Sequence, residues 1–228
     1  MNEPSGASFG ISIGLAFVGG YADASSFLLA RTFTGHLTGN CVLAAVSAAG
    51  SDWYLTLDRS LAVIVFLVGI LVSLILNRFV SVRASPLATA MFIEILLFLC
   101  ACLFISNRAN ELFIVCMCLG LGIQNGALDR TNGISVHSTY MTGMVTTMMH
   151  KSFDYLFQKR NPKEEVPKPS TGFAARVLAS MWISFISGAA IGAVMVSFFH
   201  SVGLLVILLV LVPLTFAELQ LIKPTPYR

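Results

Sequence analysis

The chain has 228 residues, of which 56% are hydrophobic and only 11% charged, and its mean hydropathy is +0.83. A soluble domain typically carries about 25% charged residues, so this composition excludes a water-soluble protein and indicates a helical protein that crosses a bilayer several times. The net charge is only +3, and no basic stripe with interleaved aromatic residues is present, which excludes nucleic acid as a partner.

Eight apolar segments are predicted, because a run of about 20 residues with few charges spans a bilayer as a helix. They cover residues 8–30, 32–50, 60–80, 86–106, 111–128, roughly 135–157, 173–199 and 202–221. The start, MNEPSGASFG, has no basic residue before the first apolar run, so we expect a retained span there and not a cleaved signal peptide. The second and sixth segments are the most polar, and the second contains the stretch TFTGHLTGNCVL.

The two halves of the sequence share short motifs in the same order, which predicts an internal duplication. GYADASSF at 20–27 resembles GIQNGALD at 122–129, and LTGN at 37–40 resembles MTGM at 141–144. We therefore predict an all-α membrane protein, a polytopic helical bundle made of two four-segment repeats. The first repeat covers residues 1–107 and the second covers residues 108–228, which include a cytoplasmic linker at 158–172.

Two topologies fit the basic residues, whose excess marks the cytoplasmic side. Eight crossings place ten of the 14 basic residues on the side of the N-terminus, whereas six crossings with two re-entrant segments place eleven there. Both topologies put the two termini and the linker in the cytoplasm. We favour eight crossings, because residues 32–50 contain no charge apart from the histidine.

A polar node is predicted in each half. If the first two segments form a hairpin that turns near Arg31, Asp23 lies at the same depth as Thr38 and Asn40, roughly 10–14 Å from the turn at 1.5 Å per residue. The second half repeats this arrangement with Asn125 opposite Thr139 and Thr142, around a turn near Gly133. Paired polar sites inside the bilayer are where transporters commonly hold their substrates.

These motifs also resemble a known family. GYADASSFLLARTFTGHLTGN, followed by GIQNGAL and TYMTG, is similar to the YoaK-like bacterial membrane proteins, which share domain of unknown function 1275. The resemblance implies a multi-pass protein of the bacterial inner membrane and adds Gln124 to the candidate site, which then comprises Asp23, Thr38, Asn40, Gln124, Asn125 and Thr142. Leu37 stands where methionine is usual in this family. The family offers no established activity.

Several of these residues also have purely structural interpretations. Asp23 is either a functional carboxyl that carries protons or a hydrogen-bonded residue that joins two helices, and the same choice applies to Glu94, the other charge deep in a span. Small residues allow helices to approach closely in membranes. We assign this packing role to Gly39, Gly69, Ser73, Gly143, Gly188 and Gly192.

Three functions remain open. The first is a small-solute transporter or permease, proton-coupled through Asp23 or Glu94 in one version. The second is a non-transporting accessory or scaffold protein, and the third, an enzyme acting on lipid, is disfavoured because no catalytic motif is present. We predict no cofactor and no metal site, since the five cysteines lie in apolar runs and the histidines are scattered. The expected partners are the lipid bilayer and an unknown small solute, with a homodimer as one way to build a pathway.

Overall fold

The computed structural model describes residues 7–79, 85–106, 110–128, 130–139, 141–157 and 171–221. The helices are α1 (Phe9–Ala30), α2 (Leu37–Ala49), α3 (Trp53–Phe79), α4 (Pro86–Ser106), α5 (Asn110–Ala127), α6 (Met141–Phe157), α7 (Thr171–Phe199) and α8 (Leu208–Leu221). A 3₁₀ helix, η1 (His200–Ile207), joins α7 to α8, and two short strands, β1 (Arg130–Thr131) and β2 (Ile134–Ser135), lie between α5 and α6.

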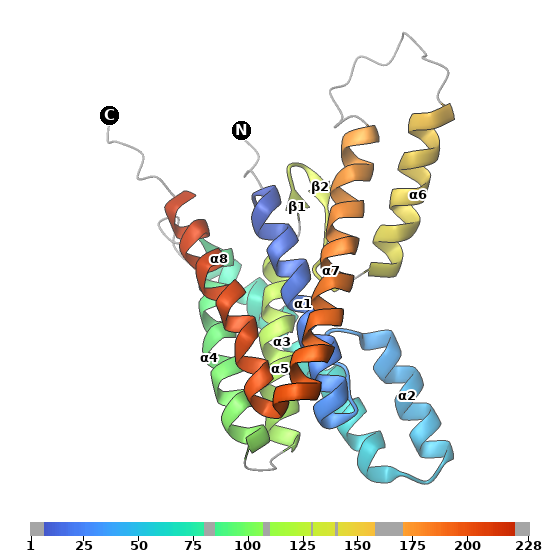
Figure 1. Cartoon of the computed structure of the whole chain (residues 1–228), viewed down its shortest axis with the longest axis vertical. Helices are drawn as coiled ribbons and strands as arrows, with labels where there is room; N and C mark the ends of the chain where they lie inside the picture. The colour runs from blue at the N-terminus through green and yellow to red at the C-terminus, as the bar shows by residue number, and fades with distance from the viewer. Residues whose placement is uncertain are drawn as a thin grey trace.

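The helices α1, α3, α4, α5, α7 and α8 pack together into an elongated bundle (Figure 1). α1 packs against α7, α3 packs against α5, and α4 packs against α5 and α8. The first residues of α1 and the last residues of α8 lie at the same end of the bundle, which we call the terminal end, and η1 lies at the opposite end (Figure 1). The prediction of a helical membrane protein is confirmed, since α1, α3, α4 and the stretch 172–221 are long and apolar enough to span a bilayer.

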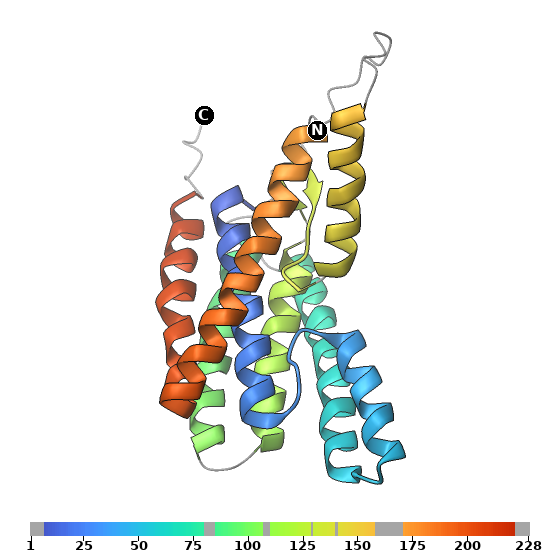
Figure 2. The ribbon, with the colours of Figure 1, turned by 45° about the vertical axis from the view of Figure 1, so that its right-hand side comes forward.

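α2 and α6 differ from the other helices because each begins part-way along the bundle. α2 runs from there toward the η1 end beside α3, and α6 runs toward the terminal end beside α7 (Figure 2). The 13 residues of α2 span about 20 Å, short of the roughly 30 Å hydrocarbon core. The expected continuous span at 32–50 is therefore wrong, and the eight-crossing arrangement is not confirmed.

We call α2 and α6 half-helices, and each follows a non-helical segment that we call a break. The first break is residues 31–36, before α2, and the second is residues 130–139, before α6. α1 ends at Arg31, whose φ of 54° and ψ of 26° place it in the left-handed region and stop the helix, and residues 32–36 lead back toward the bundle centre (Figure 2). Before α6, β1 and β2 form an antiparallel hairpin. Asn132 and Gly133 form its two-residue turn with φ of 48° and 79°, as a tight hairpin requires.

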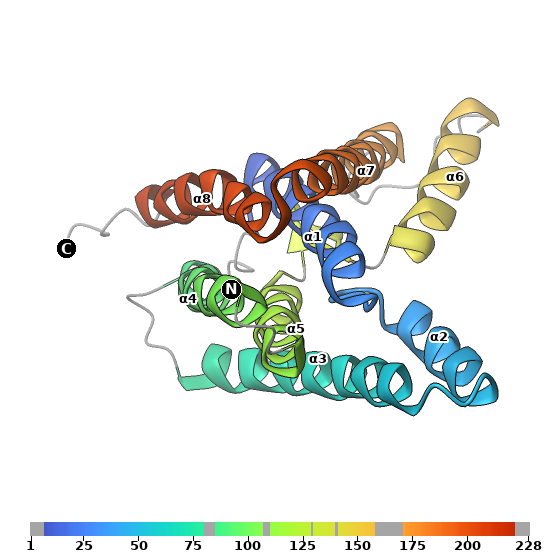
Figure 3. The same cartoon turned by 60° about the horizontal axis from the view of Figure 1, so that its bottom comes forward.

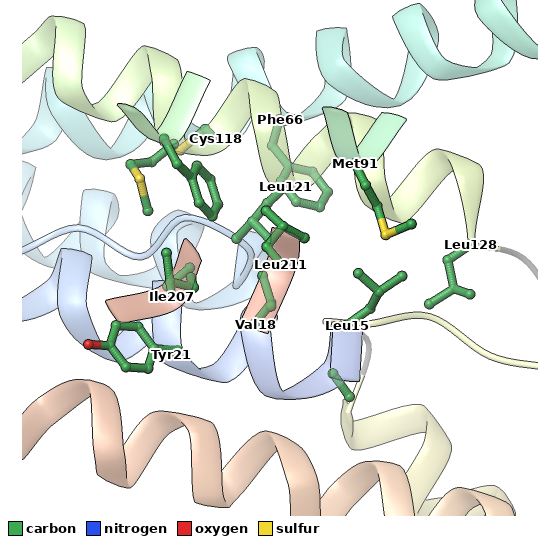
Figure 4. Close-up of a cluster of buried hydrophobic side chains, with 14 of the residues drawn as sticks. Leu15, Val18, Tyr21, Phe66, Met91, Cys118, Leu121, Leu128, Ile207 and Leu211 are labelled. Atoms are coloured by element: carbon green, nitrogen blue, oxygen red, sulfur yellow. The ribbon is translucent and has the colours of Figure 1, made fainter. Parts of the chain in front are cut away.

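The buried core lies where α1, α3, α4, α5, η1 and α8 converge (Figure 4). Leu15, Val18, Phe66, Met91, Leu121 and Leu211 pack there. Tyr21 inserts its ring into this cluster, and its hydroxyl donates a hydrogen bond of 2.5 Å to the carbonyl oxygen of Gly203. This bond ties α1 to η1, which are distant in the sequence.

Small residues occupy the points where long helices cross. A Cβ added to Gly69 would lie 2.7 Å from the carbonyl oxygen of Leu119 on α5, and one added to Gly192 would lie 2.7 Å from that of Tyr21 on α1. Gly188 lies directly against the Phe17 carbonyl, and Gly126 lies against Ser73. Larger side chains would therefore push α3 away from α5 and α7 away from α1.

Candidate functional site

The first break is held in place by the side chain of Asn40. This residue is buried in the first turn of α2, and its Oδ1 accepts a hydrogen bond from the backbone N–H of Phe33 at 3.0 Å. Its Nδ2 donates to the carbonyl oxygen of Phe33 at 2.7 Å. The Phe33 ring in turn stacks on Phe27 of α1, with 4.5 Å between the ring centroids. Asn40 thus pairs with both backbone groups of one residue and holds the non-helical chain before α2 in place.

Asp23 of α1 faces this break and is 4% exposed. Its Oδ1 accepts hydrogen bonds from the backbone N–H groups of Thr34 at 2.9 Å and Gly35 at 2.6 Å, and from the Thr34 hydroxyl at 3.2 Å. Within the part of the chain that the structure describes, its Oδ2 has no hydrogen-bond partner. Asp23 therefore holds the break with one carboxyl oxygen and keeps the other available.

The second break repeats this arrangement with neutral groups. Asn125 of α5 accepts a hydrogen bond at its Oδ1 from the hydroxyl of Ser138, at 3.2 Å. Ser138 precedes α6 by three residues, as Thr34 precedes α2. In each half, a polar residue near the end of a long helix thus contacts a hydroxyl residue just before a half-helix.

The two breaks meet inside the bundle. A Cβ added to Gly35 of the first break would lie 2.5 Å from Cγ2 of Thr139 in the second break and 3.5 Å from Oδ1 of Asp23. A Cβ added to Gly19 of α1 would lie 3.0 Å from the Ser138 carbonyl oxygen. Thr139 therefore packs against the backbone of the first break, and the starts of both half-helices come together beside α1.

Comparison with known proteins places the chain in a family. A family model described as "Protein of unknown function (DUF1275)" matches residues 11–217. The chain belongs to the DUF1275 family. It is also 27% identical over 157 residues to the UPF0700 transmembrane protein YoaK of Bacillus subtilis (strain 168), an alignment that covers 65% of this chain and 69% of YoaK. No solved structure matches it. The resemblance predicted from the motifs is thereby confirmed, and this DUF1275 protein is a multi-pass membrane protein.

The predicted site residues do not all reach the meeting point of the breaks. Thr38 and Thr142 are exposed on α2 and α6, whereas Asn40 is buried but contacts Phe33 instead of Asp23. Gln124 is fully buried on α5, and its Nε2 donates to the Leu15 carbonyl at 3.3 Å. The partners of Asp23 are therefore Thr34 and Gly35, which the sequence reasoning missed.

Glu94 lies apart from Asp23. It is 0% exposed on α4, and neither of its carboxyl oxygens has a partner among the described residues. A Cβ added to Gly120 would lie 3.3 Å from Cγ of Glu94, whereas Cys118, on the opposite side of α5, approaches the Phe33 carbonyl at 4.0 Å. α5 thus separates the two carboxyl groups that the sequence singled out as proton carriers.

Arg59 of α3 is a further buried charged residue, and the sequence analysis used it only to assign topology. It is buried, and its guanidinium donates to the Leu43 carbonyl at 2.8 Å, to the Ser47 hydroxyl, and to the Arg31 carbonyl at 3.3 Å. These bonds tie α3 to α2 and to the end of α1. Its position directly before the apolar segment predicted at 60–80, beside Asp58, was the available signal, because a charge at the edge of a span is seldom left without partners.

Among the described residues, no group of three or more His, Cys, Asp or Glu side chains lies close enough to hold a metal ion. Gly39 packs near Phe33 and His36 at the base of the first break, and Gly143 borders a cavity beside the second. The chemistry that the site offers is therefore hydrogen bonding by one carboxyl group, backbone amides and hydroxyls.

Proposed function

We propose that this DUF1275 protein is a transporter that binds a small polar solute where its two breaks meet. The observation that carries the proposal is the contact between Gly35 and Thr139, which brings two half-helices together at a buried carboxyl group. Irregular backbone at membrane depth is tolerated only where protein buries it or where it lines a pathway. Secondary transporters commonly hold substrate between such discontinuous helices, close to the bilayer midplane.

The proposal includes two halves of opposite orientation, each with three spans and one re-entrant half-helix. The packing of α1 against α7 has its counterpart in that of α5 against α3, and the packing of α2 against α3 has its counterpart in that of α6 against α7. The motif register pairs Gly69 with Gly188 and Ser73 with Gly192, and each pair contacts the opposite half in the same way. Inverted repeats let one region of the bundle open to either side in turn.

The charge distribution fits this six-span topology, as it also fits eight crossings. In this topology, three of the 14 basic residues of the sequence, Arg31, Arg59 and Arg108, are predicted on the side of the membrane opposite the termini, and the other eleven on the side of the termini. The rule that basic residues stay on the cytoplasmic side assigns the terminal end to the cytoplasm. Large apolar side chains along α3, such as Ile64, Leu71 and Ile75, are exposed and face lipid in this arrangement.

Asp23 is the group that we expect to couple transport to protons. Its Oδ2 has no hydrogen-bond partner among the described residues, and His36 is a basic side chain close enough to interact with the carboxyl group electrostatically. An unpaired charge at this depth is costly, so a proton or a solute donor on Oδ2 would lower the cost. Glu94 has the same property but lies on the far side of α5, which makes Asp23 the better candidate for direct solute contact.

Transport can be tested with purified protein in liposomes that contain a pH-sensitive dye. The probes are separate gradients of amino acids, small amines, polyols and short organic acids. We expect at least one class to move protons through the wild-type protein and Asp23→Asn to abolish this signal. The control variant is Asp52→Asn, which removes a carboxyl group that is exposed and serves as a helix cap.

A second measurement does not depend on the choice of solute. In a chain whose five native cysteines are replaced, Thr34→Cys and Ser138→Cys are treated with a membrane-impermeant thiol reagent from each side. A transporter that opens to both sides exposes each break to the reagent from at least one side. If neither cysteine reacts from either side, the interior is permanently closed, and the scaffold hypothesis replaces transport.

A further inference from the structure

A cavity of about 400 Å³ lies beside the second break. It is a partly open cavity bordered by the β1–β2 hairpin and the chain after it, by α6 and by α7. Its lining residues include Ser135, His137, Gly143, Met144, Thr147, Lys151, Ala174 and Leu178. This volume is well above that of a single water molecule and is within the range of small-ligand pockets.

The equivalent place in the first half is filled by Arg59. The LTGN and MTGM motifs align Leu43 with Thr147 and Ser47 with Lys151, and the glycine pairs of α3 and α7 align Arg59 with Leu178. In the first half, the Arg59 guanidinium donates to the Leu43 carbonyl and the Ser47 hydroxyl. In the second half, the shorter and uncharged Leu178 leaves this space open, and the positive charge is on the opposite wall.

Lys151 is that positive charge, and it is half-buried on α6. No hydrogen bond or ion pair joins its ammonium group to another described residue, and no carboxylate is among the residues that line the cavity. The hydroxyl groups of Ser135 and Thr147 and the ring of His137 provide further polar contacts. Asp154 lies three residues further along α6 but is not among the described residues that line the cavity. Within the cavity, an ammonium group without a carboxylate beside it favours an anion and disfavours a cation.

The rest of the lining is apolar. Ile134, Met144, Ala174 and Leu178 border the cavity, and the last three are buried. A ligand that fills this space therefore needs an apolar body next to its charge.

We infer that the cavity is a binding site for an oxyanion on an apolar body, a carboxylate or phosphate whose charge pairs with Lys151. The alignment with Arg59 rests on the inverted halves proposed above, but the cavity, its charge and its lining do not. The site is separate from the Asp23 carboxyl, so it can bind ligand whether or not the protein transports. Two sources supply this chemistry: a free amphiphilic acid and the headgroup of an acidic lipid.

The probe is octanoate, titrated calorimetrically into the full chain in nanodiscs of zwitterionic lipid, with empty nanodiscs as the blank. We expect saturable binding that Lys151→Gln weakens at least tenfold, because a charge-assisted hydrogen bond is lost, and that Lys151→Arg retains. Ala174→Phe keeps the charge but fills the cavity, and should also remove binding. Arg176→Gln is the matched control, since it removes one positive charge near the same end of α7, outside this cavity, and should leave the affinity within twofold of wild type.

Nanodiscs that contain an anionic lipid distinguish the two sources. A loss of octanoate binding there, restored in zwitterionic lipid, identifies a lipid headgroup as the occupant, whereas unchanged binding identifies a free acid. The inference is overturned if octanoate shows no saturable binding to the wild type in zwitterionic lipid. It is equally overturned if Lys151→Gln binds octanoate as tightly as the wild type does, which is the result expected only for the control Arg176→Gln.

Discussion

Asn40→Ala provides a direct test of how the first break is held. The substitution removes both side-chain hydrogen bonds to Phe33, the one from its N–H at 3.0 Å and the one to its carbonyl at 2.7 Å. A buried polar group left without a partner costs about 1–3 kcal/mol, and because Phe33 is only half-buried, the low end of this range applies to each of its two groups. Together they predict a loss of roughly 2 kcal/mol in the free energy of unfolding. At the scale of soluble domains of this size, this loss corresponds to a melting temperature lower by about 4–8 °C.

The assay is thermal unfolding of the purified protein in detergent, with Thr38→Ala as the matched control. Thr38 precedes Asn40 by two residues on the same half-helix, but its side chain is exposed, so its truncation should change the melting temperature very little. Asn40→Asp is a second variant of nearly the same shape. It keeps the acceptor for the Phe33 N–H but places an oxygen against the Phe33 carbonyl, and should also destabilise. Equal melting temperatures for Asn40→Ala and Thr38→Ala would refute the claim that Asn40 holds the break.

Two further predictions test helix packing and topology. Gly188→Ala places a methyl group against the Phe17 carbonyl and forces α7 away from α1, so we expect a loss of about 1–3 kcal/mol. Gly10→Ala, with open space around its Cβ, should be neutral or slightly stabilising, and an equal loss in both variants would contradict the packing argument. The topology is tested by the substitution Ser51→Cys, because Ser51 lies in the exposed turn between α2 and α3. A membrane-impermeant reagent should label it from the side opposite the termini if there are six spans. Labelling from the same side as the termini would restore the eight-crossing alternative.

The sequence was sufficient for the class of protein and for the family, because both depend on composition and on local motifs. It also predicted that Asp23 would face the stretch TFTGHLTGNCVL and that Asn125 would face the second polar segment. Asp23 does contact that stretch at Thr34 and Gly35, and Asn125 contacts Ser138. The predicted depths of Asp23 on α1 and Asn125 on α5 therefore agree with the segments that these residues contact.

The partners of Asp23 were assigned incorrectly because the second segment was treated as one continuous helix. Residues 31–36 are non-helical and lead back toward the bundle centre (Figure 2). Thr34 therefore takes the position beside Asp23 that the helical count gave to Thr38 and Asn40. Thr32, Thr34 and Gly35 are poor helix formers, which is the signal in the sequence that favours the break.

If the two halves are inverted repeats, as proposed above, polar restraints are concentrated in the first half. Asp23 has the neutral Asn125 as its counterpart, Asn40 has Met144, and Arg59 has Leu178. The first break is accordingly held by a carboxyl group, an amide and, through α2, a guanidinium, whereas a cavity borders the second. Because each buried hydrogen bond must break before its segment can move, opening is expected to begin at the second break. The thiol-labelling measurement bears on this directly: Ser138→Cys should react faster than Thr34→Cys, and the opposite order would show that the extra restraints do not fix the first half.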